Sequence, residues 1–294
     1  MIKISSSDYK EKRITYQNEW PNSNTFYREK EYICAVNNFE ENYDILFKTV
    51  NLKVLEDKNY NIVVSFLIEA LDDLRKKPLH SFLFAFMALD HVSKEMFGDN
   101  ITARLDSISE CVSSNYQEEF EILNKIIPLR SCKYIRNQLE KEERVIKRIN
   151  RDATLKCLVE KINEKYHNNG IHNEKEIADT NRKEACLYQK IIRDNLKNAT
   201  YQIEHSKRCK LVLSGYLYAL RNDISHGSVI SDTKSSTTRF NTFASDYWAF
   251  MYTYYVVIAL IKEKWAACAD SDYKESIQIN NEKYKELFKK DINR

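Results

Sequence analysis

Glycine and proline are so scarce in this chain that most turn-rich folds are out of reach. The 294 residues include 4 Gly and 3 Pro. All-β sandwiches and barrels use these residues at turns, and doubly wound α/β folds use glycine in phosphate-binding loops. The chain also has no G-x-G-x-x-G, Walker A or G-x-S-x-G sequence. This excludes the common dinucleotide-binding, P-loop NTPase and α/β-hydrolase functions. We therefore predict an all-α fold.

Apolar residues recur at helical spacing in two parts of the chain. Between 60 and 96 the pattern is interrupted at Pro78 and followed by Gly98, so we expect two helices, or one kinked helix, that end near Gly98. A second stripe runs from Cys209 to Ile224 as one predicted helix. Residues 247–261 are 15 uncharged residues with four tyrosines. They are fewer than the roughly 20 that span a bilayer, and predict a buried core helix.

The chain is predicted to contain one helical domain with two additions. Residues 1–57 are polar and aromatic with weak periodicity and predict an N-terminal extension with one or two short elements, while 58–294 are predicted to form the helical domain. Within that domain, about 129–200 is a long, charged helical insert. Residues 125–151 hold nine Lys or Arg against three acids, which makes them a candidate RNA-binding surface. The candidate contacts are Lys133, Arg136, Arg144, Lys147, Arg148 and Arg151. A solvated helix face is the alternative.

Net charge and cysteine content bear on the cellular compartment of the protein but do not indicate its activity. A net charge of +3 is too small to indicate a nucleic-acid binder from the whole chain. The seven cysteines are odd in number and widely spaced, so they predict reduced thiols rather than a disulfide framework or a C-x-x-C zinc site. The N-terminal sequence has no apolar stretch typical of a signal peptide. We expect a cytoplasmic protein without a membrane segment.

The segment LRNDISHG, residues 220–227, carries the candidate chemistry. Arg221 and His226 are separated by four residues, and Asn222 follows the arginine directly. Cleaving RNA by attack of its own 2′-OH needs a proton acceptor, for which histidine is suited near neutral pH. It also needs positive charge on the phosphorane oxygens, which arginine supplies. This chemistry requires no metal or cofactor, and we predict neither. A second R-x-x-x-x-H match, Arg75 to His80, has a proline between its ends.

RNDISHG resembles the signature of the HEPN superfamily of small all-α proteins, in which Arg and a following polar residue precede a His. The helix FLFAFMALDHVSKEMFG, residues 82–98, is similar to the first core helix of those domains. The resemblance implies a HEPN-like helical bundle and a metal-independent endoribonuclease. Arg221 would stabilise phosphate charge, His226 would act as general base or acid, and Asn222 and Asp223 would orient them. It further implies a toxin or antiphage defence effector, with an antitoxin or defence-system partner.

Helix geometry predicts that one copy of the chain does not complete this site. At about 100° per residue, Arg221 lies at the edge of the apolar face formed by Leu217, Leu220 and Ile224. His226 points nearly opposite that face. Two copies facing each other in opposite directions would bring both groups to one phosphate. We therefore expect a homodimer, which the resemblance also implies.

Two non-catalytic alternatives stay open. His226 and Gly227 would form an ordinary helix C-terminus, with the histidine favoured by the negative end of the helix and Asp223 paired with Arg221 or a lysine. The chain would then be a helical module that binds RNA or a protein partner, or a scaffold that docks another chain. Burial discriminates between these functions. Saturation of Arg221 or His226 by partners within the chain would favour a scaffold.

Overall fold

The computed structural model describes most of the chain, in two compact units. The described residues are 6–19, 26–132, 134–135, 192–194, 197, 205–228, 230–266 and 272–289. Regular structure in these ranges is helical and contains no β-strand, so the all-α prediction is confirmed. One unit comprises Met1–Gly98 and Arg221–Arg294, and the other comprises Asp99–Leu220. None of the described helices combines the length and apolar character needed to cross a bilayer.

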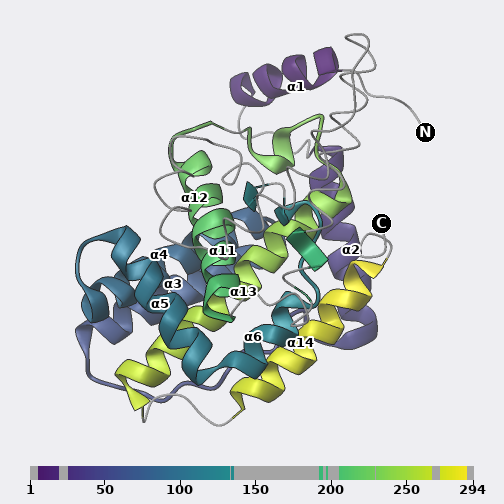
Figure 1. Cartoon of the computed structure of the whole chain (residues 1–294). Helices are drawn as coiled ribbons and strands as arrows, with labels where there is room; N and C mark the ends of the chain where they lie inside the picture. Colours follow the sequence, from purple (N-terminus) through teal and green to yellow (C-terminus); the bar gives the residue numbers. More distant parts are fainter. Residues whose placement is uncertain are drawn as a thin grey trace, which may run out of the picture. The chain divides into compact units, whose positions relative to one another are not determined.

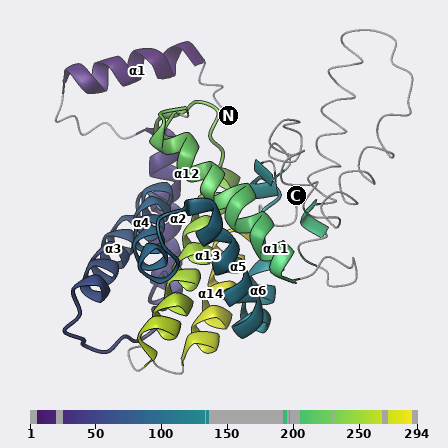
Figure 2. The same cartoon turned by 60° about the vertical axis from the view of Figure 1, so that its left-hand side comes forward.

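A long buried helix, α13 (Phe240–Lys264), forms the centre of the first unit, and all its residues from 242 to 261 are buried. The helices α3 (Lys58–Leu74) and α4 (Pro78–Phe97) pack against it. Figure 1 and Figure 2 both place α13 between the α3–α4 pair and α14 (Tyr273–Leu287). A helix that is apolar on all sides is stable only inside such a layer, and α13 includes the predicted core segment.

Three tyrosines of α13, Tyr247, Tyr254 and Tyr255, are buried with their hydroxyl groups bonded. Tyr247 donates to the Leu46 carbonyl at 3.2 Å, and the Tyr254 hydroxyl accepts from the Val50 N–H at 3.0 Å. An unpaired buried hydroxyl costs about 1–3 kcal/mol. These bonds therefore allow a central helix to carry tyrosines, and they fasten residues 46–50 to the core.

The N-terminal residues from 26 onward belong to the first unit rather than to an extension. In α2 (Tyr27–Tyr43), Tyr32 is fully buried. Its hydroxyl donates to the Leu74 carbonyl at 2.9 Å, and its ring centroid lies 4.9 Å from that of Phe243. The division of the chain therefore differs from the predicted one at residue 57, because aromatic anchors attach this segment without a regular apolar stripe.

The second unit contains α5 (Ile101–Asn115), α6 (Gln117–Asn124) and α11 (His205–Val212). The apolar stripe from 209 to 224 predicted one regular helix. It is instead interrupted by a π-helical turn, η2 (Leu213–Leu217), before α12 (Tyr218–Ser225). Gly215 lies in this turn, where an added Cβ would be 3.5 Å from Cγ1 of Ile135. The division between the two units falls within α12.

Candidate functional site

The segment that carries the candidate chemistry ends α12 with a Schellman motif. Gly227 has a φ of +64°, and its N–H donates to the Ile224 carbonyl at 3.0 Å. The Ser228 N–H donates to the Asp223 carbonyl at 2.8 Å. These two bonds satisfy carbonyls that a helix end leaves without partners. Gly227 thus caps this helix, as the non-catalytic alternative expects, through backbone bonds that do not use the side chain of His226.

Arg221 is half-buried and lies four residues before the last residue of α12. Its guanidinium carbon lies 5.9 Å from the centroid of the Phe86 ring on α4. Its Nη1 donates to Oδ1 of Asn222 at 3.1 Å, which is the orienting contact expected of that residue. No carboxylate pairs with Arg221 among the residues that the structure describes. The guanidinium is therefore positioned by a ring and an amide, and keeps its charge available.

The side chains of His226 and Asp223 also have no ion-pair partner among the described residues. His226 is exposed, and its imidazole makes no hydrogen bond or ion pair with any described residue. Asp223 is half-buried, and in the same part of the chain its carboxylate pairs with neither Arg221 nor a lysine. The ion pair of Asp223 expected for an ordinary helix terminus is therefore not seen among the described residues. Within the described part of the chain, neither Arg221 nor His226 is paired with a carboxylate.

The second R-x-x-x-x-H match provides an internal contrast. Arg75 forms an ion pair with Glu40. Nδ1 of His80 lies 3.5 Å from Oδ2 of Asp73, and burial, with the charge of Lys77, lowers the pKa of this histidine. Both ends of this match are engaged by carboxylates. The same spacing therefore produces two different environments. Among the described residues, carboxylates pair with Arg75 and His80 but not with Arg221 or His226.

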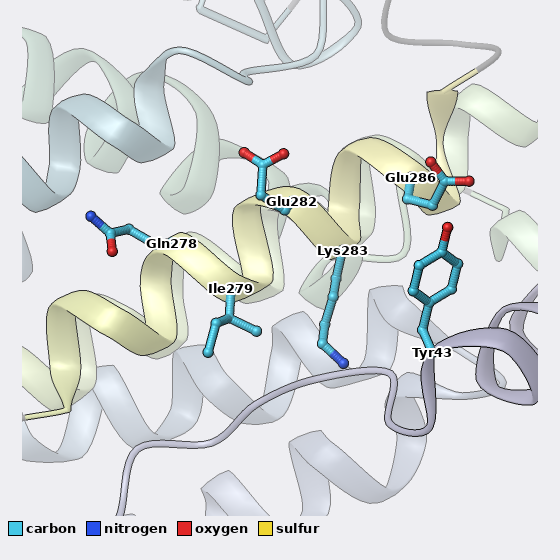
Figure 3. Close-up of a pocket in the computed structure, with 6 residues that line it drawn as sticks. All are labelled: Tyr43, Gln278, Ile279, Glu282, Lys283 and Glu286. Carbon is cyan, nitrogen blue, oxygen red and sulfur yellow. The ribbon is translucent and has the colours of Figure 1, made fainter.

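A groove of about 550 Å³ lies elsewhere on the first unit (Figure 3). It is formed by Tyr43 at the end of α2 and by one side of α14, with Glu282, Lys283 and Glu286 among its lining residues. Lys283 donates to the backbone carbonyl of Ile45. None of the motif residues lines this groove, and its charges are mixed, so it does not extend the candidate site.

The second unit holds a buried polar cluster of different character. Nε2 of His205 lies 3.5 Å from Sγ of Cys209, and Arg208 donates to Glu121 at 3.2 Å. Burial lowers the pKa of His205 to about 4. Cys209 is fully buried, so its thiol has no access to a substrate. Within the described ranges, no group of three or more His, Cys, Asp or Glu residues could hold a metal ion.

The predicted RNA contacts of the insert lie outside the described residues. They are Lys133, Arg136, Arg144, Lys147, Arg148 and Arg151. Phe86 and Lys234, by contrast, are described residues that the sequence did not connect with the site. Phe86 is marked by its spacing as a core residue only, and Lys234 lies in a polar loop without a pattern.

Comparison of the chain with protein-family models, curated proteins and solved structures found no match. The described fold and site therefore define an all-α protein with an available Arg–His pair at one helix end.

Proposed function

We propose that this chain is a metal-independent endoribonuclease of the HEPN type. The observation that carries the proposal is the state of Arg221 and His226 at the end of α12. The guanidinium has no carboxylate partner among the described residues, and the imidazole is exposed. In the matching pair Arg75 and His80, carboxylates engage both groups. Charge and proton-transfer capacity are thus retained at one of the two matches.

The proposed reaction assigns one role to each side chain. His226 accepts the proton of a ribose 2′-OH, whose oxygen then attacks the adjacent phosphorus. The bond from phosphorus to the 5′-oxygen breaks, and that oxygen takes a proton from an imidazolium, which leaves a 2′,3′-cyclic phosphate and a 5′-OH. Arg221 stabilises the charge that builds on the phosphorane oxygens. Asn222 holds the guanidinium, and Asp223 orients the pair.

The proposal includes a homodimer. Within one α-helix, five positions correspond to about 140° of rotation and about 7.5 Å of rise. Arg221 and His226 of one copy therefore diverge, and a second copy supplies the missing group. RNA is the proposed ligand. A role as a toxin or antiphage effector in the cytoplasm, with an antitoxin or defence-system partner, rests on the resemblance alone.

The test compares His226→Ala with His80→Ala as its matched control. Total RNA and tRNA are incubated with each protein in the presence of EDTA. Because a general acid–base group contributes about 10²–10⁴-fold, we expect wild type and H80A to cut and H226A to lose at least about 100-fold. Equal cutting by H226A would place the activity elsewhere. No cutting by wild type over a wide enzyme range would reject the nuclease.

The second candidate is a non-catalytic helical module that binds RNA or a protein. It is favoured by the complete Schellman motif at Gly227 and by the position of His226 at the negative helix end, where a histidine is stabilising without any catalytic role. Salt-dependent RNA binding that is unchanged in H226A, without cleavage by wild type, would support this module.

A further inference from the structure

Lys234 is enclosed by residues from the N-terminal part of the chain. It ends the short turn η3 (Asp232–Lys234) in the loop between α12 and α13. Its Nζ donates to Oε2 of Glu29 at 2.7 Å, and lies 4.5 Å from the ring centroid of Phe26 and 5.0 Å from that of Tyr16. Glu29 and Phe26 are buried. An ammonium group over aromatic rings and beside a desolvated carboxylate is held more firmly than an exposed ion pair.

The Lys234 cage, formed by Tyr16, Phe26 and Glu29, joins α1 (Ser6–Asn18) to this loop. Nη1 of Arg13, also in α1, donates to the backbone carbonyl of Lys234 at 3.0 Å. The loop is thus fastened to α1 through both the side chain and the backbone of one lysine. Figure 1 and Figure 2 show α1 beside the loop that leads from α12 to α13.

Apart from Lys234, the helix α1 is held by contacts of Tyr9, Lys12 and Tyr16 with the Phe26 ring. Tyr9 is its one buried side chain among residues 9–18, and Ile14 is 63% exposed. A polar helix of 13 residues is marginal by itself in water. The attachment of α1 therefore combines the Phe26 contacts with those made by Lys234 to Arg13 and Tyr16.

The fastened loop begins at the candidate site. Ser228 closes the Schellman motif of α12, directly after His226 and Gly227. The other end of the loop is Arg239, the N-cap of α13. The anchor at Lys234 thus lies six residues after Ser228 and five residues before Arg239.

We propose that α1 is a releasable strap, fastened by Lys234, that keeps this loop and the cap of α12 ordered. The strap does not cover the imidazole, because His226 is exposed while the strap is closed. Release is therefore expected to slow cleavage by loosening the site. The effect on cleavage rests on the proposed function, whereas the strap and its coupling to the cap do not.

Amide hydrogen exchange on the full chain tests the strap. The variants are Lys234→Met, Lys234→Arg and Glu29→Gln. The control is Lys210→Met, which removes an ion pair of similar length, 2.8 Å to Asp106, in the second unit. We expect K234M and E29Q to speed exchange about tenfold or more in α1, in 230–238 and at the Gly227 and Ser228 amides. K234R, which retains a cation, should stay close to wild type, and K210M should leave these amides unchanged.

Each result decides one part of the proposal. Unchanged exchange of α1 in K234M would overturn the strap. Faster exchange in α1 with unchanged Gly227 and Ser228 amides would overturn its coupling to the cap. If wild type cuts RNA, K234M should cut several-fold more slowly than K210M, and equal rates would overturn the effect on the site. If wild type does not cut RNA, the proposed function fails, and exchange alone decides the strap.

Discussion

The guanidinium of Arg221 shows how much of this site depends on single neighbours. It lies over the Phe86 ring, and its Nη1 donates a hydrogen bond to Oδ1 of Asn222, which orients it. A lysine would keep the charge but lose the planar, two-pronged donor that fits a phosphate. We therefore expect Arg221→Lys to cut RNA about tenfold more slowly or worse. Steady-state cleavage of a short RNA measures this, and a rate equal to wild type would show that only charge is needed.

Phe86 is predicted to be a positioning residue. Phe86→Leu removes the ring under Arg221, while Phe82→Leu is a matched control at a buried ring 5.9 Å away. Both changes are expected to cost stability in the core by about 1 kcal/mol. Only F86L should lower kcat several-fold with little change in KM, because only this variant removes the ring that lies under Arg221. Equal kcat values for the two variants would mean that Phe86 serves packing only.

His205 is predicted to make the stability of the protein depend on pH. Burial, aided by the charge of Arg208 and opposed by that of Glu121, lowers the pKa of His205 to about 4. The pKa of a histidine in an unfolded chain is about 6.5. Between these values the unfolded chain binds the extra proton, so stability falls as pH drops through that window.

Urea midpoints between pH 7.5 and 4 measure this dependence. His205→Gln should flatten the curve. Parallel curves for H205Q and wild type would show that the acid sensitivity comes from other groups.

The sequence could predict the residues of the motif but not their distant neighbours. Asn222 follows Arg221 directly, so their contact is local and could be anticipated. The contacts of Arg221 with Phe86 and of Lys234 with Glu29 join residues that are far apart in the chain. The helical spacing identifies Phe86 only as a core residue, and no pattern in the polar loop indicates a role for Lys234. Such contacts depend on the tertiary fold.

At the scale of elements, two glycines end helices in different ways. Gly98 ends α4 at a φ of 86° and a ψ of −170°, a conformation that is almost restricted to glycine. Gly227 has a φ of +64°, which asparagine also adopts. Added Cβ atoms would meet nothing within 4 Å at either position, so backbone strain alone decides the effect.

Denaturant unfolding should therefore separate these two glycines. We expect Gly98→Asn and Gly98→Ala each to cost about 1–3 kcal/mol. Gly227→Ala should cost about 1–2 kcal/mol, and Gly227→Asn clearly less. Equal losses for the two asparagine variants would contradict the assigned conformations.

Helix boundaries followed the sequence where backbone chemistry is local. Pro78 begins α4 and Gly98 ends it, as predicted. The π-helical turn η2 could not be predicted from the stripe, because Leu213 and Leu217 are buried in either geometry. Within residues 1–57 only one or two short elements were predicted, whereas α2 has 17 residues. Its anchors are aromatic side chains, such as Tyr32 against Phe243, rather than a regular apolar period.

At the scale of the molecule, the candidate site lies where the chain re-enters the first unit. The chain leaves that unit after Gly98 and returns at Arg221. Composition placed the main division at residue 57, because it separates polar from apolar sequence. The observed division separates segments that pack together. A segment with weak periodicity can still join a core, as residues 26–57 do.

Mixing two inactive variants would test the proposed homodimer. Arg221→Ala and His226→Ala should each be inactive alone. In a hybrid dimer, one composite site takes Arg221 from one copy and His226 from the other, and stays intact. Random reassortment makes about half of the dimers hybrid, each with one of two sites, so about a quarter of wild-type activity should return.

The double variant R221A/H226A mixed with R221A is the matched control and should recover nothing. Sedimentation equilibrium must show a dimer for each protein, which makes failure to complement interpretable. A dimer without recovery would place both groups of one site on the same copy. A monomer that cleaves RNA would also refute the composite site, because that site takes Arg221 from one copy and His226 from another.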